Sequence, residues 1–333
     1  MDNNSFILVQ NSSGTNNGSW SIGEVCYFMF DLLAFSFNLL VLSLVYMDRT
    51  TRTSFQIYIA NLCSVNLLYG FTVFYNVANI KQSFPDRPPW LFCLVLRYLY
   101  YITAGLINNA HFLIAVNRVW AITHDQPISY RQYNRNNAIR NPLIICICMW
   151  LYAHLWVIPA VAMDTMTPRN PPDLHHCSPR ILWSLKWSIA AAMILYNFPI
   201  VATCVLCPFI LYKTMKRRRQ SGRNQVAQST GQRLVGDSVI QSVLNNQPTQ
   251  TSISRVLNSQ FLTLTVLTLN VIVCLLPAQL FHALPLFGID PPGAIIVVDT
   301  LYTTSPIIDA LLFLLTVKSL QDRLKSLFRC NSF

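Results

Sequence analysis

The chain has 333 residues, of which 53% are apolar and only 11% are charged, and its formal net charge at pH 7 is +11. Soluble globular domains carry about 25% charged residues, so this composition excludes an ordinary soluble protein and predicts a membrane protein. The positive charge gathers in the polar segments between apolar blocks, which is a pattern that sets membrane topology. We therefore do not interpret it as a nucleic-acid-binding surface.

Seven apolar blocks follow a polar tail over residues 1–24. Each block is about as long as the roughly 20 residues that a helix needs to cross the hydrocarbon core of a bilayer. We predict an all-α membrane protein whose seven-transmembrane helix bundle forms one domain over residues 25–317. The expected spans lie near residues 25–46, 55–79, 91–116, 142–163, 184–212, 256–284 and 294–317.

The basic residues predict the orientation of the bundle. Eighteen of the 24 Lys and Arg residues fall on the same side of the membrane if the chain starts outside. Because cytoplasmic loops are enriched in Lys and Arg, we expect a multi-pass protein of the plasma membrane with an extracellular N-terminus. The tail contains three N-x-Ser/Thr sequons, and these are expected glycosylation sites: Asn3, Asn11 and Asn17.

Two of the ten cysteines fall at the expected outer face, in an oxidising compartment. A disulfide between Cys93 and Cys177 would tether the loop over residues 164–183 to the third span. Cys26 is a competing partner, because the sequence alone does not fix disulfide connectivity.

The inner segments predict two further elements. Residues 213–255 contain a basic cluster at Lys216–Arg219 and are otherwise rich in Gln, Asn and Ser, so we expect a partly disordered loop whose ends extend the fifth and sixth spans. Residues 318–333 place apolar residues at steps of three and four opposite basic ones, which predicts an amphipathic helix on the inner leaflet and a short tail. Cys330 is either a palmitoylation site there or an unmodified thiol.

A short motif ends the third span, where residues 117–119 read Asn-Arg-Val. With seven spans and the Cys93/Cys177 pair, it resembles the Asp-Arg-Tyr motif of the rhodopsin-like (class A) G-protein-coupled receptors, and the resemblance covers nearly the whole chain. Other positions resemble the family's motifs in order and spacing: Asn38, Leu62 with Asn66, Trp150, Pro159, Pro199, Cys274-Leu275-Leu276-Pro277, and Ser305-Pro306-Ile307-Ile308-Asp309.

Four motif positions depart from the family. Asn117 replaces the acid whose salt bridge holds the neighbouring arginine at rest, and Asn66 replaces the acid that binds sodium in the family. Leu275 replaces the tryptophan of the sixth span, and Asp309 replaces the tyrosine of the seventh. The resemblance therefore implies a divergent receptor whose resting state is weakly held, and we expect measurable signalling without a ligand.

The resemblance assigns a role to the inner end of the third span. It implies that Arg118, beside Asn117, caps a cavity that receives the carboxy-terminal helix of a heterotrimeric G protein α subunit, with Arg131 and Lys216 beside it. A topology-setting charge is the alternative for Arg118, and it is the favoured interpretation for Arg131 and for the Lys216–Arg219 cluster.

The outer halves of the third, sixth and seventh spans carry residues that are either packing or a ligand pocket: Arg97, Tyr100, Tyr101, Thr103, Ala104, Gln279, His282, Asp299 and Tyr302. Amine receptors of the family place an Asp at the position of Tyr100, and visual pigments place the retinal Lys at that of Asp299. The resemblance therefore disfavours a biogenic amine and excludes retinal. Arg97 favours an anion and Asp299 a cation, so we expect a small molecule or short peptide of mixed charge, unless Asp299 pairs internally with Arg97.

Other functional classes remain as alternatives. The altered motifs of the sixth and seventh spans suit a scaffold, decoy or dimer partner that does not signal, and the membrane acids Asp31, Asp299 and Asp309 suit a transporter or channel. The sequence shows no catalytic constellation and no metal-ligand spacing, so we expect neither an enzyme nor a cofactor. His111 and His154 are interpreted as satisfied core groups. The expected partners are a G protein, an extracellular ligand and membrane lipids.

Overall fold

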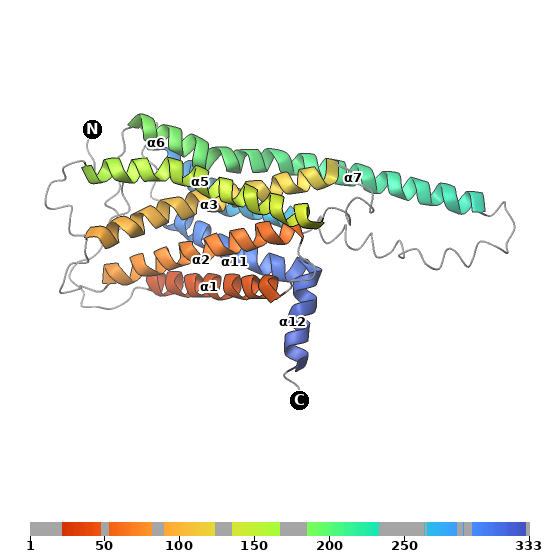
Figure 1. Cartoon of the computed structure of the whole chain (residues 1–333), viewed down its shortest axis with the longest axis horizontal. Coiled ribbons are helices and arrows are strands. Elements are labelled where there is room, and N and C mark those ends of the chain that lie inside the picture. Colours follow the sequence, from red (N-terminus) through yellow and green to blue (C-terminus); the bar gives the residue numbers. More distant parts are fainter. Residues whose placement is uncertain are drawn as a thin grey trace.

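The computed structural model describes residues 22–47, 53–81, 90–123, 135–166, 185–232, 263, 265–284, 289 and 295–330. Within these ranges, seven helical spans are long and apolar enough to cross a membrane. They lie side by side in one bundle (Figure 1). The predicted all-α fold with seven membrane-spanning helices is therefore confirmed.

The observed helices agree closely with the apolar blocks, because a bilayer offers no water to the backbone and each span must bond its own N–H and C=O groups. The first four spans are α1 (Ile22–Met47), α2 (Ser54–Lys81), α3 (Trp90–Thr123) and α5 (Arg135–Met166). The fifth combines α6 (Leu185–Ala191), η3 (Ala192–Asn197) and α7 (Phe198–Gln232). The sixth combines helical residues 265–270, η4 (Val271–Leu275) and α10 (Leu276–Ala283), and the seventh is α11 (Ile295–Thr316).

Two elements lie beyond the spans at the end of the bundle that the sequence predicts to face the cytoplasm, which we call the inner end. α7 continues to Gln232, so the first half of the predicted inner loop is helical, in agreement with the expected extension of the fifth span. Residues 233–262 lie outside the described part of the chain. α12 (Lys318–Cys330) follows α11 and turns away from the bundle axis at the end where α7 projects (Figure 1). The predicted amphipathic helix is therefore present, and it ends at Cys330.

Two π-helical segments interrupt the fifth and sixth spans, and each lies next to a proline. Pro199 follows η3 and Pro277 follows η4. Proline has no N–H and therefore leaves the carbonyl four residues earlier without its helical donor. For Pro199 that carbonyl belongs to Leu195, and the side chain of Asn109 on α3 donates to it over 3.0 Å. A polar side chain of the third span thus provides the hydrogen-bond donor that this backbone carbonyl of the fifth span lacks.

The same two spans approach closely at Gly105. A Cβ atom added to Gly105 would lie 2.9 Å from Cγ of Leu195, which is fully buried. Small residues permit such close packing between membrane helices, where dispersion contacts supply much of the association energy. Gly105 is therefore required by the α3–η3 contact.

We expect Gly105→Ala to destabilise the bundle. Overpacking costs about 1–3 kcal/mol, which exceeds the helix-propensity gain of up to about 1 kcal/mol on replacing Gly by Ala. In a Leu195→Ala background the added methyl has room, so the same substitution should become neutral or stabilising. Thermal unfolding of the four proteins in nanodiscs, followed by circular dichroism, measures the effect. An equal effect of Gly105→Ala in both backgrounds would contradict this account.

Candidate functional site

Arg118 lies at the inner end of α3 and is buried, with 9% of its surface exposed. Its guanidinium carbon lies 3.6 Å from the centre of the Phe55 ring on α2. A cation over an aromatic face is stabilised by about 0.5–2 kcal/mol, which partly compensates for the loss of water around the charge. The neighbouring Asn117 provides no acid to pair with Arg118. The ring of Phe55 thus supplies a contact for the arginine.

The neighbours of Arg118 close the inner end of the bundle. Val119 packs against the buried residues Cys207 and Ile210 of α7. The hydroxyl of Thr268, in the sixth span, donates to the sulfur of Cys207 over 2.7 Å. The third, fifth and sixth spans therefore meet at the level of the arginine. Lys216 is exposed on α7, further along the helix than Ile210, and Arg131 lies outside the described residues.

A buried amide pair joins the first, second and seventh spans. Asn38 donates to the carbonyl of Pro306 over 3.0 Å and to that of Ala34 over 2.7 Å, and its own Oδ1 accepts a 3.2 Å hydrogen bond from Asn66. The structure thus brings together three positions that the sequence resemblance had selected separately. The neutral amide at position 66 is thus held by another amide through its nitrogen.

Asp309 forms a second polar centre on α11, and no part of its surface is exposed. Its Oδ1 accepts a 2.8 Å hydrogen bond from Asn270, which also donates to Ser305 Oγ over 2.9 Å. Its Oδ2 lies 3.1 Å from Nε2 of His111 on α3, and both side chains are completely buried. Neither of these two atoms has a partner in hydrogen-bond geometry. His111 was interpreted from sequence as a satisfied core histidine: it is buried, but the interpretation as satisfied is wrong, because both ring nitrogens lack a hydrogen-bonding partner and its neighbour is a membrane acid.

His154, the other core histidine, contacts the hydroxyl of Tyr98 through Nδ1 and stacks on the Tyr98 ring. The interpretation of His154 as a satisfied core group is therefore correct. Within the described residues no cluster of three or more His, Cys, Asp or Glu could hold a metal ion.

The aromatic residues expected in the outer half pack together. The rings of Tyr100 and Tyr101 meet edge to face at 5.7 Å, and the Tyr69 ring lies 5.4 Å from that of Tyr302 and 6.2 Å from that of Tyr100. Tyr196 on η3 donates to the Tyr101 carbonyl over 2.9 Å. Tyr69 and Tyr196 were absent from the sequence-based set, so this cluster draws on four spans instead of two.

The polar residues of the outer half separate into a buried and an accessible group. Arg97 and Gln279 are buried, with 9% and 8% of their surfaces exposed. His282 Nε2 lies 3.5 Å from Asp299 Oδ1, and these side chains are 39% and 41% exposed. Asp299 therefore has a histidine neighbour on the sixth span, and both side chains are partly exposed.

The structure describes two of the three cysteines considered for the predicted disulfide. Cys93, at the start of α3, is disulfide-bonded. Cys26 carries a free thiol, so it is not the partner. Cys177, the glycosylation sequons and the side chain of Cys330 lie outside the described residues, so the Cys93–Cys177 pairing and both modifications stay predictions.

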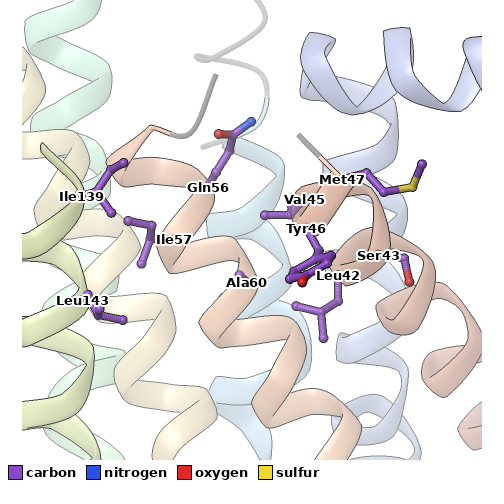
Figure 2. A pocket seen from close by; sticks show the side chains of 10 residues that line it. All are labelled: Leu42, Ser43, Val45, Tyr46, Met47, Gln56, Ile57, Ala60, Ile139 and Leu143. Carbon is purple, nitrogen blue, oxygen red and sulfur yellow. The ribbon is translucent and has the colours of Figure 1, made fainter. Parts of the chain in front are cut away.

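A groove of about 580 Å³ lies away from the predicted ligand pocket. It is bounded by the inner ends of α1 and α2 and by α5 (Figure 2), and its wall includes Leu42, Ile57 and Leu143. All three belong to membrane-spanning segments. None of the residues expected in the outer ligand pocket lines this groove.

Several site residues were missed by sequence reasoning. Phe55 and Asn270 both contact a motif residue, although neither occupies a motif position itself. A signal was available for Asn270, because a polar side chain inside an apolar span is costly and by default suggests a role. No comparable signal marks Phe55, since aromatic residues are common in apolar spans.

A seven-helix membrane bundle with a buried arginine at its inner end and polar centres between its spans is an architecture that suits a seven-transmembrane receptor. Residues 37–316 match the family model of the 7 transmembrane receptor (rhodopsin family), and the chain belongs to this family. It is a receptor in class and not an enzyme, as predicted.

Two curated relatives are similar to this chain at low sequence identity. It is 25% identical to the histamine H1 receptor of Bos taurus over 172 residues, which cover 50% of this chain and 33% of that receptor. It is 28% identical to a purinoceptor of Rattus norvegicus, purinoceptor 6, over 192 residues, covering 56% and 55% of the two chains. The matched segments span less than two thirds of either relative.

Replacing Asn38 by alanine should destabilise the protein by about 1–3 kcal/mol, because it leaves the buried amide of Asn66 without its acceptor. Ser43→Ala is the matched control, since Ser43 lies on the same helix and bonds only to the carbonyl of Leu39. The comparison requires the unfolding temperatures of both variants in nanodiscs. If Asn38→Ala unfolds at the temperature of the control, the amide pair does not hold the three spans together.

Proposed function

We propose that this chain is a plasma-membrane receptor, with its N-terminus outside, that couples an extracellular ligand to heterotrimeric G proteins. The observation that carries the proposal is the inner end of α3, where Arg118 is buried against Phe55 and the third, fifth and sixth spans meet. This arrangement suits a cavity that is closed at rest and opens around a charged group.

Activation then requires two packings of one bundle. In the closed packing Arg118 rests on the Phe55 ring. In the open packing the inner ends separate, and the guanidinium meets the carboxy-terminal helix of the α subunit. A ligand shifts the balance only through its different affinity for the two packings. Because an aromatic contact replaces the usual acid, we expect measurable nucleotide exchange without a ligand.

The outer half supports a ligand of mixed charge. Asp299 and His282 form a partly exposed pair, whereas Arg97 provides a buried cation in the same half. Tyr100 packs among aromatic rings and carries no charge for an ammonium group. We therefore propose a short peptide or small zwitterion as the ligand, although one relative is named for histamine.

Arg118→Ala should reduce ligand-independent nucleotide exchange by about tenfold or more, because a hydrogen bond to a charged group contributes about 1.5–3 kcal/mol. The assay uses the receptor in nanodiscs with purified G proteins of each α class. Arg140→Ala is the control, since Arg140 is an exposed arginine at the inner end of α5. Equal exchange by wild type and Arg118→Ala would argue against the role of this arginine. Exchange no faster than in empty nanodiscs for every α class would favour the scaffold or decoy alternative.

The ligand proposal is tested with a panel of biogenic amines, including histamine, and a library of short peptides. We expect no amine to raise nucleotide exchange, because position 100 offers no acid. A peptide that raises exchange should lose about tenfold in potency in Asp299→Asn, which removes one charge contact. The control is Asp322→Asn on α12, outside the spans. Activation by an amine that is unaffected by Asp299→Asn would refute the proposed ligand class.

A further inference from the structure

The contacts of Asp309 link three spans in the middle of the bundle. His111 belongs to α3, Asn270 immediately precedes η4 in the sixth span, and Asp309 belongs to α11. We call these three residues the core latch. His111 lies seven residues before Arg118, and therefore about 10 Å from it along the helix axis toward the outer side.

The burial of the latch makes it an all-or-none contact. His111 and Asp309 lie 3.1 Å apart and both side chains are completely buried, and an apolar interior tolerates two such groups together far better than either one alone. Separation of α3 from α11 would leave each group buried without its partner. The geometry therefore favours a pair that is either closed or fully broken, as a two-state switch requires.

The latch is also incompletely hydrogen-bonded. Both ring nitrogens of His111, Oδ2 of Asp309 and Oδ1 of Asn270 are buried without a hydrogen-bonding partner in the protein. Such atoms cost free energy, so this packing is held mainly by the His111–Asp309 contact and by the bonds that Asn270 donates to Asp309 and Ser305. Rotation of the sixth span about Asn270 would break those bonds and weaken the cluster.

We infer that the core latch holds the inner end of the bundle closed, and that its rupture opens the cavity around Arg118. The contact between His111 and Asp309 supplies part of the restraint that an acid at position 117 would provide, and the part that is missing accounts for the signalling expected without a ligand. The inference rests on the proposed function, since opening matters only if a partner enters the cavity. The latch itself is tested by readouts that need no G protein.

Reversal of the charge pair provides the decisive test. His111→Asp alone and Asp309→His alone each place two like groups in contact, whereas the double variant restores an acid and a histidine in exchanged positions. We expect each single variant to unfold at a temperature lower by about 5 °C or more. The double variant should recover at least half of the loss. Losses in the double variant equal to the sum of the single losses would overturn the latch.

Alkylation of native cysteines reports opening directly. Cys207 is 1% exposed and is covered by Thr268 of the sixth span, so it should react when the inner end opens. Cys63, fully buried on α2, reports general loss of packing. In the single variants we expect Cys207 to react at least about threefold faster, with Cys63 still protected, and in the double variant its rate should return toward wild type. Equal acceleration at Cys63 and Cys207 would overturn the inference.

A milder variant covers the case in which the reversed pair does not fold. Asp309→Asn keeps a polar side chain for Asn270 and removes only the charge, so Cys207 should again react faster. The matched control is Asp31→Asn, which neutralises another buried acid, on α1 beside Gly70 and away from α3. A faster reaction in Asp309→Asn but not in Asp31→Asn supports the latch, and an unchanged rate in Asp309→Asn overturns it. If these results support the latch while no variant promotes nucleotide exchange, the proposed coupling fails and the latch stands.

Discussion

Polar side chains buried between apolar helices are the constraint on which this bundle depends. In a bilayer, lipid surrounds the helices with material as apolar as their own side chains, so burial of apolar surface discriminates weakly between one packing and another. A buried amide or carboxylate does discriminate, because it must find a partner at one place on a neighbouring helix. Asn38, Asn109, Asn270 and Asp309 each find such a partner on another span.

These contacts are distributed unevenly over the spans. The Asn38–Asn66 pair ties α1, α2 and the Pro306 carbonyl together by hydrogen bonds between neutral groups. The sixth span is held to its neighbours through Asn270 to Asp309 and Ser305, and through Thr268 to Cys207. Thr268 and Asn270 both lie just before the π segment η4. Under the proposed function, these are the contacts that differ between the two packings.

The fold followed from the sequence almost completely, whereas the site followed only in part. The length of an apolar block can be read along the sequence, and a block long enough to cross the bilayer forms a helix there. The positions of Arg118, Asn38 and Pro306 could also be read along the sequence, because the family's motifs occur in a fixed order. The sequence could not show that Phe55 stacks on Arg118 or that His111 faces Asp309, because those contacts depend on how the helices rotate and on where π segments shift their faces.

Substitutions at the family's motif positions gain a common explanation from these contacts. The chain lacks an acid at positions 66 and 117, yet it carries one at position 309, where the family has tyrosine. A buried acid is stabilised by a partner, and His111 lies 3.1 Å from Asp309, whereas the neutral Asn66 bonds to Asn38. Of the motif positions 66, 117 and 309, only the last carries an acid, and it lies at the interface of the third and seventh spans. The restraint on Arg118 then acts about two helical turns away from the arginine, through the packing of α3.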